Sequence, residues 1–182
     1  MKKFWLLVLA SALPAHALAA SADETAMVQD ASGFYGVYIA LPHDGIPDNA
    51  ARAKFAPLIT PVLEKLLADG EAAEARYAKE TRNQSPPIIE GDLFTSLFEG
   101  ATSFKLGACV ANGDSGHCAV SFVYNDKTAK PTEWTDTVYL ARTADGWRVD
   151  DISYGGHWDF GNKGRLTDTL KFAVKAAAES AE

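Results

Sequence analysis

Three aspartates in the second half of the chain have the residue type and the setting that proton transfer requires. Asp150 and Asp151 are adjacent in a predicted strand, and Asp136 lies in the predicted strand before it. Because neighbouring residues of a strand point to opposite faces, one of the adjacent pair faces the inner side of a sheet. A carboxylate in an apolar cavity can act as the base of an isomerase or dehydratase. The alternative is structural, because such acids also accept hydrogen bonds from the backbone or from arginines such as Arg148 and Arg165.

A histidine beside an acid is a second candidate for general-base or metal chemistry. His157 lies in a glycine-rich segment, two residues before Asp159. The other histidines have no i, i+4 partner or other metal-ligand spacing. The chain also lacks the GxSxG, HExxH and phosphate-loop motifs. We therefore expect no metal and no cofactor, and we assign no catalytic residue. The weak catalytic candidates are Asp136, Asp151 and His157.

Aromatic side chains occur on the same predicted strands as these acids. Trp134 and Tyr154 lie on strands, and Trp158 follows the last strand. Aromatic residues on strands mostly fill cores, which is the structural interpretation. The functional interpretation is a cavity or surface that binds a small apolar ligand or a protein. Such a surface would use Trp134, Asp150, Tyr154 and Trp158.

Helical periodicity and capping residues indicate the elements that precede and follow these strands. Thr60 is a suitable cap before Pro61, because proline is tolerated at the first helical position. Asp92 is a suitable cap, and Gly100 a suitable stop, for a short helix between them. Apolar residues at spacings of three and four support the other helices. The predicted helices span about 23–41, 61–82, 93–99 and 166–179.

Between residues 104 and 154 the apolar period changes from helical to alternating. Four runs, at 104–108, 120–124, 134–140 and 147–154, are separated by short segments rich in turn formers. The pair Asp145-Gly146 is a strong hairpin signal. Short connections predict an antiparallel sheet, and helices before and after it predict an α+β domain with the helices on one face. Residues 21–182 therefore form a single predicted domain.

The first twenty residues have the pattern of a cleaved secretory signal peptide. Lys2 and Lys3 precede an apolar run, and Ala17 and Ala19 occupy the −3 and −1 positions of a cleavage site. We therefore predict export to a bacterial periplasm. No cysteine lies at the cleavage site, where a lipoprotein carries its lipid, so we expect no stable membrane anchor. Without the two lysines, the formal net charge changes from −7 to −9. This acidity argues against binding to nucleic acid or to anionic membranes.

The two cysteines fit that compartment. Cys109 and Cys118 flank a segment rich in turn formers, and neither has the spacing of a redox CxxC motif. Because the periplasm is oxidising, we predict a disulfide across this hairpin. A bridge that closes a loop of about ten residues contributes roughly 2–3 kcal/mol. The alternative is a pair of buried free thiols.

Several blocks of the chain resemble one family of bacterial envelope proteins. They are FYGVYIALPHDGIP, PPIIEGDLFTSLFEG, EWTDTVYLAR and WRVDDISYGGHWDFGNKGRL. This family, known as domain of unknown function 3828, includes the YbjP/YqhG-like proteins. The resemblance implies the cone-shaped α+β fold of nuclear transport factor 2, with N-terminal helices on a curved antiparallel sheet of about four strands. It brings no established catalytic residues. Some relatives are lipoproteins, but this chain lacks the lipid-bearing cysteine.

These observations favour a non-enzymatic binding or accessory protein of the cell envelope, acting on an envelope protein or a small apolar ligand. Domains of this class often dimerise through the open sheet face, so a homodimer is among the expected partners. The first alternative is an isomerase or dehydratase with an Asp base in the cone. The second is a periplasmic immunity protein, because acidic proteins of this size often neutralise basic toxins.

Overall fold

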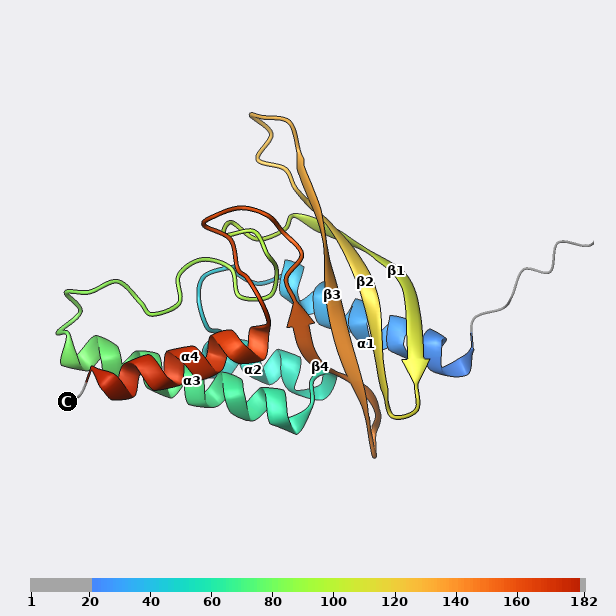
Figure 1. The fold of residues 1–182 in the computed structure, drawn as a ribbon, viewed down its shortest axis with the longest axis horizontal. Helices are drawn as coiled ribbons and strands as arrows, with labels where there is room; N and C mark the ends of the chain where they lie inside the picture. The colour runs from blue at the N-terminus through green and yellow to red at the C-terminus, as the bar shows by residue number, and fades with distance from the viewer. Residues whose placement is uncertain (1–20, 181–182) are drawn as a thin grey trace, which may run out of the picture.

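The computed structural model describes residues 21–180, and the predicted signal peptide lies outside them. Figure 1 shows helices α1, α2, α3 and α4 and one sheet of strands β1 to β4. The elements are α1 (Ala22–Ile39), α2 (Asn49–Phe55), a 3₁₀ turn (Ala56–Leu58), α3 (Pro61–Glu80), β1 (Ser103–Asn112), β2 (Ser115–Tyr124), β3 (Thr132–Thr143), β4 (Gly146–Ser153) and α4 (Leu166–Glu179). None of the helices in this part of the chain has the length and hydropathy needed to cross a membrane.

The sheet is antiparallel, with strand order β1-β2-β3-β4. Along β2, Cys118, Val120 and Phe122 are buried, whereas the residues between them are exposed. The same alternation along β3 shows that the sheet has a buried inner face and an open outer face. The predicted α+β class, with an antiparallel sheet, is confirmed.

Helix α1 lies against the inner face of the sheet, where it contacts β1, β2 and β4 (Figure 1). Its buried residues recur at spacings of three and four, which gives the helix one apolar face. Ser21 and Glu24 form a reciprocal capping box at its start. The Tyr35 ring packs against Phe122 of β2, with ring centroids 5.1 Å apart. Helix α1 therefore fills the centre of the core.

The predicted disulfide is confirmed. Cys109 and Cys118 are paired partners on β1 and β2, and both lie on the inner face. The bond joins the two strands of the hairpin near the edge of the sheet. Strand β1 lies at the edge of the sheet and pairs only with β2, and the disulfide keeps these two strands together near their hairpin turn.

The helix predicted at 93–99 is wrong, because this segment is a loop. The Asp92 amide N–H donates to the Phe98 carbonyl over 2.8 Å, which closes the loop on itself. The Ser96 amide N–H donates to the side chain of Asp136 on β3 instead of to a helical carbonyl. Tertiary hydrogen bonds thus replace the helical ones.

Helix α2, which has seven residues, was not expected from the sequence. Asp48 caps it, and its carboxylate accepts from the Ala51 amide over 2.8 Å. A helix this short has almost no periodic signal.

Strand β4 contains a β-bulge at Asp150, the first of its two adjacent aspartates. Tyr139 pairs with Asp151, but the next residue of β3, Leu140, pairs with Val149. Asp150 is therefore the extra residue, and the strict alternation of faces ends there. As a result, both aspartates border one surface groove between α3 and α4.

Candidate functional site

Asp136 is fully buried, and donors from three segments surround its carboxylate. The backbone amides of Ser96 and Gly155 donate over 2.9 and 2.8 Å, and the Trp134 indole N–H donates over 3.1 Å. The Ser96 hydroxyl donates to the same carboxylate. Burial raises the pKa of Asp136, and these hydrogen bonds oppose that increase. Asp136 joins the 92–100 loop and the segment after β4 to the sheet.

Asp151 and Asp150 are also bound to protein groups. Asp151 accepts from the Arg165 guanidinium over 2.6 Å, and from the amide and hydroxyl of Thr167 over 3.1 and 3.0 Å. It therefore holds the start of α4. Asp150 accepts from the Thr60 hydroxyl over 2.7 Å, at the start of α3. Both carboxylates thus fix helix N-termini to the bulge of β4.

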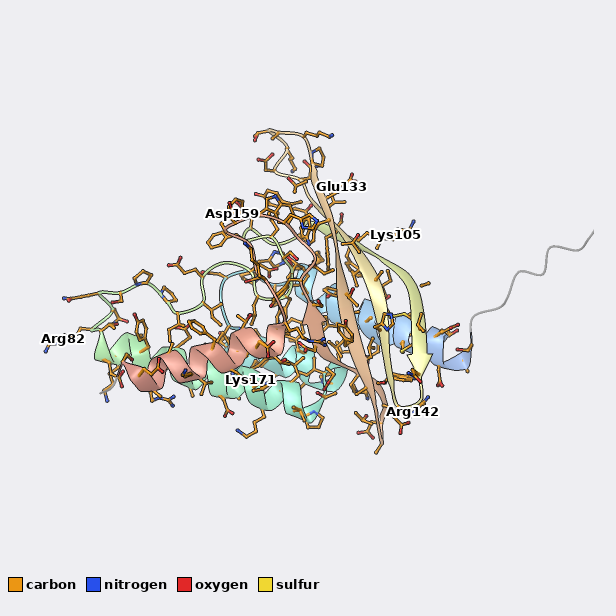
Figure 2. All side chains as sticks on the ribbon, viewed as in Figure 1. Arg82, Lys105, Glu133, Arg142, Asp159 and Lys171 are labelled. Atoms are coloured by element: carbon orange, nitrogen blue, oxygen red, sulfur yellow. A yellow bond between two sulfur atoms is a disulfide. The ribbon has the colours of Figure 1, made fainter. Side chains whose placement is uncertain are left out.

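The remaining residues named from the sequence lie near the end of the sheet where β3 begins. Trp134 and Trp158 pack edge to face, 5.6 Å between centroids, and His157 is exposed beside them. Asp159, on the same loop, and Glu133 lie at this end of the molecule (Figure 2). Tyr154 is buried, and its hydroxyl donates to the Leu93 carbonyl over 2.7 Å. Trp134 and Tyr154 therefore act mainly as core residues.

A cavity that was not expected from the sequence lies between the end of α1, α2 and the 92–100 loop. Its volume is about 240 Å³. Tyr38, Phe55 and Phe94 supply aromatic walls, and Asp92 and His43 supply polar groups. The other lining residues are Leu41, Pro42, Asp44, Gly45, Ile46, Pro47, Asp48 and Ala51. We call this space the α1–α2 cavity.

Asp92 is the most buried acid that lines the α1–α2 cavity, with an exposure of 1%. One carboxylate oxygen accepts from the Thr95 hydroxyl over 2.5 Å and from the Tyr38 hydroxyl over 3.2 Å. The other oxygen accepts only a long contact of 3.4 Å from the Phe94 amide. Burial raises the pKa of Asp92 to about 6, although the Thr95 hydroxyl and His43 oppose the increase. Its carboxylate is therefore less completely bonded than that of Asp136.

His43 forms a second polar element of the cavity, in the loop after α1. Its ring stacks on that of Tyr38, with centroids 4.2 Å apart, and its Nε2 lies 3.1 Å from the Tyr38 carbonyl oxygen. Gly100 lies under the imidazole, where a Cβ would come within 2.4 Å of Nδ1. Gly100 also has a φ of +77°, which favours glycine. The close packing fixes the orientation of the imidazole.

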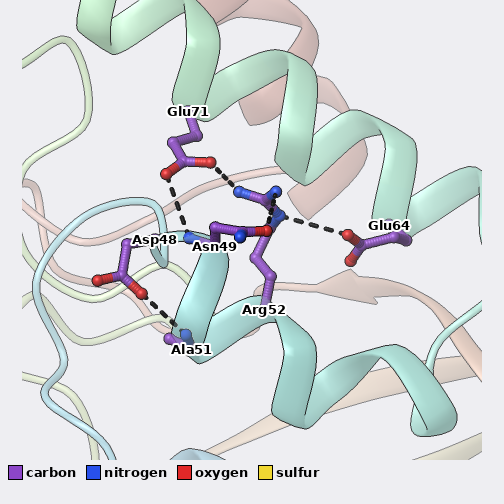
Figure 3. Close-up of polar contacts among 6 residues, drawn as sticks. All are labelled: Asp48, Asn49, Ala51, Arg52, Glu64 and Glu71. Atoms are coloured by element: carbon purple, nitrogen blue, oxygen red, sulfur yellow. Dashed lines mark hydrogen bonds and ion pairs between the residues drawn. The ribbon is translucent and has the colours of Figure 1, made fainter.

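Helix α2 forms one wall of the cavity, and an ion-pair cluster attaches it to α3 (Figure 3). The buried Arg52 donates from Nε to Glu64 over 3.3 Å and from Nη1 to Glu71. Glu71 also accepts from the Asn49 amide at the start of α2, over 3.2 Å. On the opposite side, the Gly45 amide donates to the Gly91 carbonyl over 2.6 Å and closes the rim loop. The wall and the rim are therefore held by specific polar contacts.

No family model matches the chain, and no curated protein is found as a relative. Within residues 21–180, no group of three or more His, Cys, Asp or Glu side chains is arranged to hold a metal ion. The cavity must therefore be interpreted from its own groups. Asp92 and Gly100 have the residue types of a helix cap and a helix stop, and Tyr38 lies within the helix predicted at 23–41. The signal that could have found the site is the His-Asp-Gly-Ile-Pro segment after α1, where a polar loop follows a helix of aromatic residues.

Proposed function

We propose that the protein is a periplasmic binding protein of the bacterial envelope that holds a small ligand in the α1–α2 cavity. The observation that carries this proposal is a cavity of about 240 Å³ with aromatic walls and one buried, incompletely bonded carboxylate. Ligand sites in proteins combine mostly apolar walls with a few placed polar groups. The cavity has this composition.

The volume sets the size of the ligand. An apolar cavity of about 150 Å³ is enough to bind benzene, and drug-sized ligands occupy about 300–1,000 Å³. A space of about 240 Å³ therefore fits a small molecule with roughly one ring and a polar substituent. A peptide or an oligosaccharide would extend beyond it.

Compartment and family are part of the same proposal. The sequence pattern of residues 1–20 supports export, and the disulfide is compatible with an oxidising compartment. A sheet covered on one face, with α1 against that face, is compatible with the cone-shaped fold of nuclear transport factor 2. The sequence blocks that resemble the envelope family support the same assignment.

A second candidate function is proton transfer, with Asp92 as the base in place of Asp136 or Asp151. The observation that favours it is the pKa of Asp92, which burial raises to about 6, close to the value at which a general base is effective at neutral pH. The Tyr38 hydroxyl, which donates to Asp92 over 3.2 Å, lies beside the same space. Asp136 and Asp151 are bound to groups of the protein and are less suited to this role.

The test is a small-probe titration of the protein expressed from its full sequence. Benzylamine, benzyl alcohol and benzoate each present one ring and differ in charge. We expect at least one of them to shift the amide NMR signals of residues that line the cavity. Absence of specific shifts with all three probes at millimolar concentration would contradict a small-ligand function.

Two alanines of α2 provide matched variants for this test. Ala51 lines the cavity, whereas Ala53 is exposed on the same helix. Ala51→Leu is expected to fill part of the cavity and to remove the shifts, whereas Ala53→Leu is expected to leave them unchanged. Both changes suit a helix, since leucine has a high helix propensity. Equal binding by the two variants would place the probe elsewhere.

A further inference from the structure

We propose that the α1–α2 cavity binds a small organic cation, an amine with an apolar body, whose ammonium group pairs with Asp92. This inference rests on the proposed ligand-binding function and specifies the chemical class of its ligand. It follows from the charges, the hydrogen bonds and the wall residues of the cavity.

Asp92 is a buried carboxylate without a lysine or arginine partner among the described residues. Buried charges are normally paired or fully hydrogen-bonded, because removal from water is costly. Asp151 has Arg165 at 2.6 Å, and Asp136 has four donors. Among the described residues, no Lys or Arg forms an ion pair with Asp92, and one of its oxygens has only a contact of 3.4 Å. An ammonium group in the cavity would supply the missing charge.

The charged groups around the cavity are mostly acidic. Its acidic and basic lining residues are Asp92, Asp44, Asp48 and His43, and the lining residues include no lysine or arginine. The exposed Asp44 and Asp48 lie at the rim, and Asp48 also caps α2. An anionic ligand would meet like charges at the rim and at Asp92. A cation is attracted at both places.

The walls of the cavity are aromatic and apolar. Tyr38, Phe55 and Phe94 present aromatic rings to the cavity, and Leu41 and Ile46 complete an apolar surface. Aromatic faces attract organic cations through the ring quadrupole. A bare metal ion would need several oxygen or nitrogen ligands, whereas these walls suit a carbon skeleton. A protonated amine with an apolar body satisfies both the carboxylate and the walls.

Cation binding in the cavity is expected to weaken as the pH falls. Because the pKa of Asp92 is about 6, the carboxylate is charged at pH 7.5 and mostly neutral at pH 5. The other acidic and basic groups that line this space are His43, Asp44 and Asp48. Because protonation of Asp92 removes the buried negative charge, acidification weakens cation binding.

The experiment measures the affinity of benzylamine, benzyl alcohol and benzoate by isothermal titration of the full-sequence protein at pH 7.5. We expect benzylamine to bind about tenfold tighter than benzyl alcohol, because only the amine adds the attraction of a positive charge to its hydrogen bond with the carboxylate. We expect benzoate to bind most weakly. The preference for the amine is expected to disappear at pH 5.

The charge of Asp92 is tested by Asp92→Asn, with Asp159→Asn as the matched control at an exposed acid that does not line the cavity. Asp92→Asn is expected to reduce the affinity for benzylamine to that of benzyl alcohol, whereas Asp159→Asn changes it by less than about threefold. If Asp92→Asn does not fold, as judged by circular dichroism, the three wild-type affinities and their pH dependence still decide the question.

The outcomes separate this inference from the proposed function. Equal binding of amine and alcohol, or tighter binding of benzoate, would overturn the assignment of a cation while leaving a small-ligand site in place. Binding of none of the three probes would overturn both. Benzylamine binding that Asp92→Asn leaves unchanged would place the ammonium group at another acid and would also overturn the inference.

Discussion

Replacement of Asp136 by alanine tests whether this carboxylate is a structural group or one that is free for chemistry. Three N–H groups, on Ser96, Gly155 and Trp134, donate to it from separate parts of the chain. Alanine would leave the buried N–H groups of Ser96 and Trp134 without an acceptor in the protein interior, whereas Gly155 is exposed. The Ser96 hydroxyl can rotate toward another acceptor, so it adds little to the loss. The expected effect is therefore on stability.

The size of the effect follows from these donors. An unsatisfied buried polar group costs about 1–3 kcal/mol. Burial of the Asp136 carboxylate raises its pKa and therefore opposes its ionisation in the folded protein. Replacement by alanine removes this cost. The two contributions leave a net loss of about 2–4 kcal/mol in the free energy of unfolding. For a domain of this size, about 1 kcal/mol lowers Tm by about 2–4 °C, so a decrease of about 10 °C is expected.

The assay is urea and thermal unfolding followed by circular dichroism. Asp159→Ala is the matched control, since the Asp159 side chain is fully exposed on the loop after β4 (Figure 2). This control is expected to change stability by less than about 0.5 kcal/mol. If Asp136→Ala were as stable as the control, the structural role would be refuted, and Asp136 would again be a candidate for chemistry.

Three further predictions concern α2, the disulfide and α1. Arg52→Met is expected to lower the free energy of unfolding in urea by about 2 kcal/mol and to weaken probe binding (Figure 3). Breaking a fully buried ion pair costs ~3–5 kcal/mol, but the two glutamates here are about a third exposed, so the expected loss is smaller. Unchanged binding would show that the cavity does not depend on this cluster. The double variant Cys109→Ala/Cys118→Ala is expected to lose about 2–3 kcal/mol, and reductant should lower Tm in the wild type alone. Burial raises the pKa of Asp30 from 3.8 to about 7, against the opposing charge of Arg148. The neutral acid is therefore favoured in the folded state, so the stability associated with Asp30 is fully present below about pH 4 and is lost as the pH rises through about 7. Asp30→Asn should flatten that part of the pH profile, and an unchanged profile would contradict the assignment.

The buried acids Asp136, Asp151 and Asp92 differ in their bonding partners, and this difference explains why a pattern of carboxylates in the sequence does not identify a site. Asp136 has four donors, Asp151 has an arginine and a helix N-terminus, and Asp92 has three donors beside an open volume. All three are aspartates near apolar residues in the sequence. Their chemistry differs because segments distant in the chain supply or withhold donors.

Local sequence signals were sufficient for most of the secondary structure. The cap at Thr60 followed by Pro61, the alternating apolar residues of β2 and β3, and the Asp145-Gly146 turn each act within a few residues. The hairpin cysteines were also predictable, because a turn-rich segment between two strands places their side chains together. Signals of this kind need no knowledge of the tertiary structure.

The loop at 92–100 shows where local signals fail. Asp92 and Gly100 have the residue types of a helix cap and a helix stop, yet Asp92 binds the Tyr38 hydroxyl, 54 positions earlier, and Gly100 lies under His43. The backbone amide of Ser96 is bound by Asp136, 40 positions later. Hydrogen bonds over such separations have no counterpart in a local pattern, and they outweigh the helical preference.

Composition and periodicity by themselves determined the α+β class, the antiparallel hairpins and the disulfide, because each depends on neighbours in the chain or on alternation along one strand. Only the tertiary structure decided which aspartate borders a cavity. The bulge at Asp150, the attachment of α2 by Arg52 and the closure of the rim at Gly45 bring together segments far apart in sequence. Burial and the supply of donors are properties of that assembly, and they set the charge and the reactivity of each carboxylate.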